Sequence, residues 1–148
     1  MRIEGDYTIK APRDKVWAVL LDPQAIAKCM PGCEEMKEIG PNEFEARMKI
    51  GIAAVKGEYT GKIKILEQTP PSHYKLSGEG GGTPGFIQGD VSIDLEEKSG
   101  ETLIRYVSEA KVGGIIAGVG QRMIGGISKM IVGQFFKKME EVVLSRGT

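Results

Sequence analysis

The chain contains 148 residues, of which 41% are hydrophobic and 27% are charged. These values are typical of one globular domain, here residues 1–148, and exclude a disordered or collagen-like chain. Twenty basic residues balance twenty acidic ones, so we expect no nucleic-acid partner, because broad phosphate neutralisation needs an excess of Lys and Arg.

The predicted elements begin with a strand over residues 2–10, where polar and apolar side chains alternate. Ala11-Pro12-Arg13-Asp14 opens a short helix, since proline is favoured in a first helical turn, and this helix ends near Asp22-Pro23. A second short helix covers residues 24–30. Six strands are predicted from 33 to 112, separated by the turn signals Gly40-Pro41-Asn42, Val55-Lys56-Gly57, Thr69-Pro70-Pro71, Gly81-Gly82-Thr83-Pro84 and Lys98-Ser99-Gly100.

The last segment, residues 115–146, is predicted to form one long helix. Its inner face is defined by apolar residues at spacings of three and four, namely Ile116, Val119, Met123, Ile127 and Met130. The order of elements predicts an α+β fold, in which a curved seven-stranded antiparallel sheet surrounds the long C-terminal helix and two short helices follow the first strand.

The inward face of the predicted sheet contains many small residues, among them Gly61, Gly78, Gly89 and Ser108. Protein interiors are closely packed, so this face either marks bends and close helix contacts or encloses a cavity. The second interpretation predicts an apolar ligand cavity lined by Phe44, Met48, Tyr59, Ile63, Tyr74, Leu76, Gly80, Tyr106, Ala110, Met123 and Ile127.

Catalytic and metal-binding residues are not predicted. The inward strand positions contain no Asp, Glu, His, Lys or Arg, although acid–base chemistry needs a titratable group within reach of the substrate. His73 is the only histidine, and Cys29 and Cys33 lack the second ligand pair of a zinc site. We therefore expect no cofactor and no metal, and interpret these three residues as structural or surface positions.

Charge is distributed unevenly along the chain. Residues 111–139 contain five basic and no acidic residues, whereas residues 1–110 contain 14 basic and 18 acidic ones. The outer face of the long helix is either solvated or contacts an anionic membrane or a partner protein. The second interpretation assigns this contact to Arg122, Lys129, Val132, Phe136, Lys137 and Lys138.

Residues 1–6 lack the apolar run of a signal peptide. No uncharged apolar stretch reaches the roughly 18 residues that a spanning helix needs, because Arg122 and Lys129 interrupt the only candidate segment. These features predict a cytoplasmic protein that touches a membrane only peripherally.

Several short motifs, taken in their order and spacing over about residues 2–145, resemble the CoxG family of carbon monoxide dehydrogenase subunits. This family lies within the START-like, polyketide-cyclase-like helix-grip (SRPBCC) superfamily. The motifs are Leu21-Asp22-Pro23, Met30-Pro31-Gly32-Cys33, residues 57–61, Gly78-Glu79-Gly80, Val112-Gly113-Gly114, Gly120-Gln121-Arg122-Met123-Ile124 and Gln134-Phe135-Phe136.

The resemblance implies a hydrophobic cavity between sheet and helix. It also implies an accessory role with a molybdenum-containing carbon monoxide dehydrogenase or related hydroxylase, through membrane recruitment and binding of a lipid- or quinone-like molecule. A different interpretation is a START-like cyclase or hydrolase, for which Glu35 and Arg122 are the nearest titratable candidates. A third is a dehydrogenase assembly factor with an empty pocket.

Overall fold

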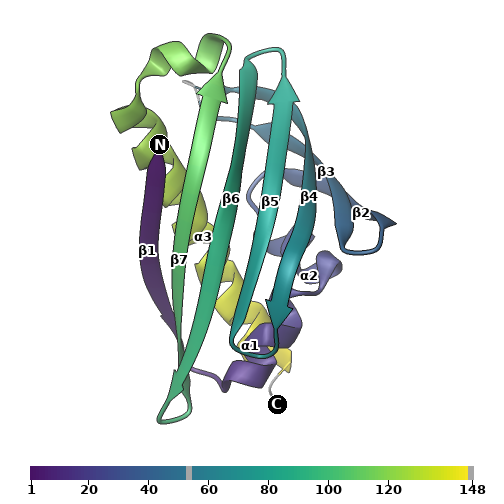
Figure 1. Ribbon diagram of the computed structural model, residues 1–148, viewed down its shortest axis with the longest axis vertical. Coiled ribbons are helices and arrows are strands. Elements are labelled where there is room, and N and C mark those ends of the chain that lie inside the picture. Colours follow the sequence, from purple (N-terminus) through teal and green to yellow (C-terminus); the bar gives the residue numbers. More distant parts are fainter. Residues whose placement is uncertain (53–54, 147–148) are drawn as a thin grey trace.

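The computed structural model describes residues 1–52 and 55–146. It has the helix-grip fold that the sequence predicts: an antiparallel sheet in the order β1-β7-β6-β5-β4-β3-β2 curves around a long helix (Figure 1). From β2 to β7 each strand pairs with its neighbour along the chain, and the first strand closes against the last. The strands are β1 (Arg2–Ile9), β2 (Cys33–Gly40), β3 (Glu43–Ile50), β4 (Gly57–Thr69), β5 (His73–Gly82), β6 (Gly85–Lys98) and β7 (Glu101–Gly113).

Two short helices, α1 (Arg13–Leu20) and α2 (Pro23–Cys29), follow β1 as predicted. Proline supplies the N-cap of α1 and the first residue of α2, in agreement with its preset backbone angle. The Asp22 carboxylate caps α2 by accepting a hydrogen bond from the Gln24 backbone N–H at 3.0 Å. Both helices therefore start where the sequence indicates, and they lie across one end of the sheet (Figure 1).

The C-terminal segment differs from the prediction of one helix from residue 115. A 3₁₀ helix, η2 (Ile115–Val119), is followed by the long helix α3 (Gln121–Arg146). The two are separated by Gly120, whose φ of 98° is readily adopted only by glycine. Because the helix is interrupted here, the apolar residues of η2 and those of α3 do not lie on one continuous helix face.

The inner and outer faces of α3 differ from those that the sequence predicts. Ile124, Phe136, Met139 and Val143 are buried against the sheet, whereas Met123 and Met130, predicted to face inward, are 54% and 44% exposed. Val132 and Phe136, predicted to face outward, line an interior cavity instead.

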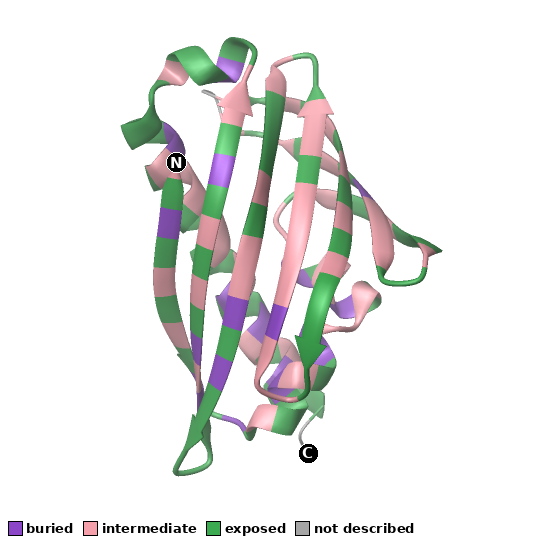
Figure 2. Ribbon diagram, viewed as in Figure 1, coloured by how far each residue is buried: buried purple, intermediate pink, exposed green. Residues whose placement is uncertain are grey.

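The closely packed core occupies the end of the molecule that α1 and α2 cover (Figure 2). Val16 of α1, Ile104 of β7 and Met139 of α3 are fully enclosed there. Toward the other end, inward side chains are mostly half-buried. The space between sheet and helix is therefore solid at one end and incompletely filled along the rest.

A comparison of two methionines in α3 tests the corrected helix orientation. Met139→Ala removes a fully buried side chain and should lower the free energy of unfolding by about 2–5 kcal/mol. Met130→Ala, a matched change at an exposed position, should alter it by less than about 0.5 kcal/mol. Denaturant unfolding measures both values, and similar losses for the two variants would contradict the orientation described.

Candidate functional site

The unfilled space contains an apolar cavity of about 270 Å³ between the middle of the sheet, α2 and α3. We call it the aromatic cavity, since aromatic rings from the sheet and from α3 contribute to its walls. It is lined by Leu20, Leu21, Pro23, Ile26, Met30, Met36, Phe44, Ile63, Ile65, Tyr74, Leu76, Val91, Ile93, Tyr106, Ile131, Val132, Phe135 and Phe136. An apolar hole of about 150 Å³ in another protein binds benzene, so this one has room for an aromatic ring.

A second apolar cavity, of about 230 Å³, lies toward η2 and the β5–β6 hairpin. We call it the end cavity. Ile131 of α3 lines both cavities, so they adjoin each other at this residue. The end cavity is lined by Met48, Ile50, Val55, Tyr59, Gly61, Gly80, Ile87, Val112, Ile116, Ile124, Ile127, Ser128 and Ile131.

Small residues cross the sheet between the inward positions that line the two cavities. Strand pairing places Ala46 opposite Gly61, Gly78 opposite Gly89, and Gly89 opposite Ala110. At Gly89 an added Cβ would lie 2.3 Å from the Glu109 carbonyl oxygen, so close backbone approach explains this glycine. At Gly78 and Gly80 the atoms nearest to such a Cβ lie 3.8 Å away, an ordinary contact distance, so close backbone approach does not explain these two glycines.

The structure brings together most of the predicted cavity residues. Phe44, Ile63, Tyr74, Leu76 and Tyr106 line the aromatic cavity; Met48, Tyr59, Gly80 and Ile127 line the end cavity. Their role in ligand binding stays a prediction.

Two predicted cavity residues lie elsewhere. Met123 is on the outer face of α3, where it is 54% exposed. Ala110 is buried but lines neither apolar cavity; it borders a hollow of about 780 Å³ whose lining includes the outward charged residues Lys62, Asp90 and Glu109.

Sequence analysis missed one wall of the aromatic cavity, which the segment from the end of α1 to β2 provides through Leu21, Ile26, Met30 and Met36. The apolar spacing in residues 20–30 was the available signal. It could not be used, because nothing local to a helix of 7 or 8 residues indicates which part of a sheet the helix covers.

An ion pair joins this wall to α3. The Arg146 guanidinium donates to the Asp22 carboxylate at 2.7 Å. This hydrogen bond holds the pKa of Asp22 below its ordinary value, although burial opposes the shift. The N-terminus of α2 is thus tied to the C-terminal turn of α3 at neutral pH, and the attraction weakens only as the carboxylate protonates in acid.

The three tyrosine hydroxyls of the cavities differ in their surroundings. The Tyr59 hydroxyl donates to the Val55 carbonyl at 2.6 Å. The Tyr106 hydroxyl lies over Gly5 of β1, 2.5 Å from where a Cβ would stand. No hydrogen bond joins the Tyr74 hydroxyl to any residue that the structure describes.

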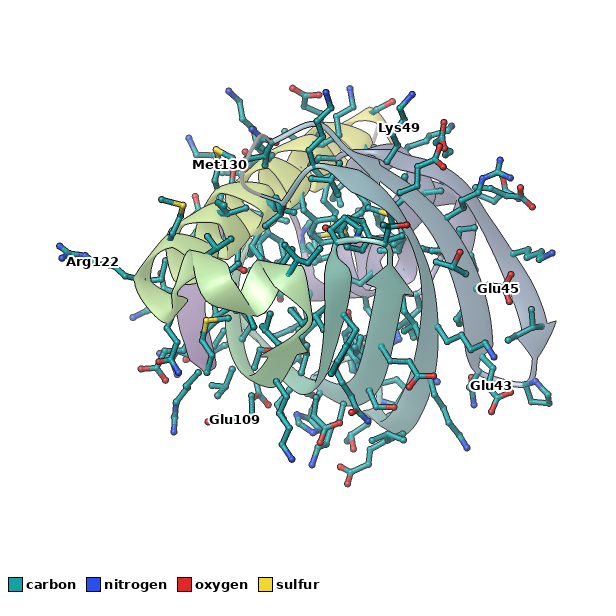
Figure 3. The ribbon with its side chains drawn as sticks, turned by 90° about the horizontal axis from the view of Figure 1, so that it is seen from above. Glu43, Glu45, Lys49, Glu109, Arg122 and Met130 are labelled. Carbon is teal, nitrogen blue, oxygen red and sulfur yellow. The ribbon has the colours of Figure 1, made fainter. Side chains whose placement is uncertain are left out.

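Charged side chains lie outside both cavities. Glu43, Glu45 and Glu109 point away from the outer face of the sheet, and Arg122 points away from α3 (Figure 3). Glu35 is exposed and its carboxylate lies 3.4 Å from the Arg47 guanidinium. Neither Glu35 nor Arg122, the two titratable candidates for catalysis, lines a cavity.

His73 and the cysteines also lie away from the cavity linings. The His73 ring contacts Asp94 at 2.8 Å and Glu67 at 3.7 Å. Burial raises the pKa of the Cys29 and Cys33 thiols, which disfavours the reactive thiolate. Among residues 1–52 and 55–146, no group of three or more His, Cys, Asp or Glu side chains is arranged to hold a metal ion.

Comparison with known proteins agrees with this architecture. The chain matches the family model of CoxG, a carbon monoxide dehydrogenase subunit, over residues 5–144. No curated protein matches it. The crystal structure of a conserved protein from Geobacillus kaustophilus is similar, with a TM-score of 0.96 and 38% sequence identity over 98% of this chain and 96% of that one.

More distant structures share the fold alone. A protein from Chromobacterium violaceum has a TM-score of 0.74 and 17% identity, with 96% of both chains covered. Ara h 8.0201 has a TM-score of 0.72 and 17% identity, with 98% of both chains covered.

Proposed function

Since the chain belongs to the CoxG family of carbon monoxide dehydrogenase subunits, we propose that it is an accessory module that binds a hydrophobic molecule. The observation that supports this most directly is the pair of adjoining apolar cavities between the sheet and α3. The ligand class that fits them is a lipid- or quinone-like molecule. The partner would be a molybdenum-containing carbon monoxide dehydrogenase or a related hydroxylase.

Binding would be driven by burial of apolar surface, which contributes about 25 cal/mol per Å². The described lining residues provide no Asp, Glu, His, Lys or Arg, so a buried charge on the ligand would have no partner. No observation favours the alternative of a cyclase or hydrolase. We therefore propose a binding role and no catalytic one.

The end of the molecule nearest the end cavity has an exposed apolar surface. Ile115 is 76% exposed, and Phe86 and Met123 are about half exposed. Ile87 and Ile116, which are the chain neighbours of Phe86 and Ile115, line the end cavity, so the exposed apolar surface lies next to it. No helix in the described part of the chain is long and apolar enough to span a bilayer. We propose that this end contacts the membrane peripherally and exchanges the ligand there.

Basic residues extend this contact along α3. Arg122, Lys129, Lys137 and Lys138 are exposed, as the sequence predicts, and basic residues near anionic lipid contribute on the order of 1 kcal/mol each. Val132 and Phe136 cannot take part, because they line the aromatic cavity. Met123 and Met130 take their place as the exposed apolar residues of this face.

Adjacent glycines in β5 allow a matched test of ligand binding. Gly80 lines the end cavity, and a Cβ there would meet nothing closer than 3.8 Å, so Gly80→Leu should fill the cavity without displacing the backbone. Gly81 points to the opposite face, where a Cβ also has ordinary contacts. Gly80→Leu should weaken binding of the neutral fluorophore N-phenyl-1-naphthylamine at least tenfold, whereas Gly81→Leu should not.

Titration of fluorescence against protein concentration measures this difference. Circular dichroism confirms that both variants fold. Equal affinities of the folded variants for the fluorophore would contradict a ligand site in the end cavity.

The membrane contact is tested by removing four positive charges from α3 in one variant and four from the sheet in another. Changing Arg122, Lys129, Lys137 and Lys138 to Gln should abolish salt-sensitive binding to vesicles that contain phosphatidylglycerol. Changing the exposed Lys49, Lys62, Lys98 and Arg105 on the sheet to Gln gives the same net charge and should preserve it. Vesicle flotation at low salt, where attraction is least screened, measures both. Equal loss in the two variants, or no binding by the wild type, would contradict a membrane contact through α3.

A further inference from the structure

Tyr74 is the most enclosed polar side chain of the aromatic cavity. It stands near the start of β5, is 3% exposed, and lines the cavity wall. The ring of Trp17 meets it edge-to-face, with ring centroids 5.4 Å apart. Its position in the sheet is fixed by pairing with Gln68 of β4 and Ile93 of β6. The ring is therefore held by α1 and by both neighbouring strands.

The Tyr74 hydroxyl has no hydrogen-bond partner in the described part of the chain, although buried hydroxyls usually have one. Among the same residues, no side-chain N or O atom is both sealed from water-sized space and unpartnered. The hydroxyl must therefore adjoin open space. Because Tyr74 is otherwise enclosed and lines the aromatic cavity, that space is the cavity.

The other tyrosines do not duplicate this arrangement. Tyr59 uses its hydroxyl within the protein, on the Val55 carbonyl, and the Tyr106 hydroxyl lies over Gly5 at the edge strand. Burial raises the pKa of Tyr74, so its hydroxyl keeps its proton and remains a donor. Tyr106 also lines this cavity, and its hydroxyl likewise has no hydrogen-bond partner in the described part of the chain, but Tyr106 is only half-buried. Tyr74 is therefore the more deeply enclosed of the two donors in an otherwise apolar lining.

We propose that Tyr74 selects the ligand by donating a hydrogen bond to a neutral acceptor oxygen, such as a carbonyl, at the end of the molecule held in the aromatic cavity. This inference rests on the proposed binding function and adds to it the chemistry of the recognised group. An anionic head group is excluded, because the described lining offers no cation to compensate a buried carboxylate. A hydrocarbon without an acceptor fills the cavity but leaves the hydroxyl unpaired.

Two probes of nearly the same shape test the proposal. 2-Acetylnaphthalene carries a carbonyl oxygen, and 2-ethylnaphthalene lacks it. Tyr74→Phe, which removes only the hydroxyl, should weaken binding of 2-acetylnaphthalene about three- to tenfold, the range of one neutral hydrogen bond. It should leave the affinity for 2-ethylnaphthalene within about twofold. Displacement of N-phenyl-1-naphthylamine measures both affinities in the intact protein.

Tyr59→Phe is the matched control, because the Tyr59 hydroxyl already donates to the Val55 carbonyl. This variant should leave the ratio of the two probe affinities unchanged. If Tyr74→Phe weakens both probes equally, or neither, Tyr74 does not recognise the acceptor and the inference fails, while apolar binding stands. If neither probe nor the fluorophore binds the wild type, the proposed function fails together with the inference.

Discussion

Phe136 of α3 lies at the boundary between the packed core and the aromatic cavity, because it belongs to both. Its ring lies between Tyr7 of β1 and Tyr106 of β7, with centroids 5.6 Å from each. These contacts join the helix to the first and last strands, which are themselves paired. On one side of Phe136, toward Met139 and Val143, the helix and α1 pack into a solid core. On the other side the helix faces the row of small residues, and the interior remains unfilled.

This arrangement separates an apolar interior from a charged outer surface. The described linings of both cavities are apolar apart from tyrosine hydroxyls, the Ser128 hydroxyl and backbone groups. The charges lie on the outer face of the sheet and on the outer face of α3 (Figure 3). Apolar side chains reach the surface near η2, beside the end cavity. The aromatic cavity, with Tyr74, lies further inside.

The period-2 alternation predicts the seven strands, and it also predicts the inward faces of β1 and of β3 to β7, because each inward position depends only on its own strand. The phase of α3 could not be obtained in the same way. Ile116 and Val119 appeared to continue the helical stripe, and the single positive φ at Gly120 separates them from it. A glycine in a helical pattern is either tolerated or ends the helix, and the sequence alone does not distinguish these outcomes.

The part of the candidate site that lies on β3 to β7 could be predicted from the sequence, whereas the part that lies on α2 and β2 could not. Strand residues such as Ile63 and Leu76 were identified, since their direction follows from the alternation. The wall formed by Ile26 and Met36 was missed, because it depends on how distant segments pack. How deeply each tyrosine is enclosed depends on long-range packing, such as the contact of Tyr74 with Trp17 of α1.

We propose that the space between the sheet and α3 holds one neutral apolar molecule. Native mass spectrometry of the protein purified from its own host, followed by organic extraction and identification of the extract, tests it most directly. We expect a species heavier than the polypeptide by the mass of one uncharged, oxygen-bearing apolar compound, which the extract also contains. Detection of the polypeptide mass alone, with an empty extract, would contradict it.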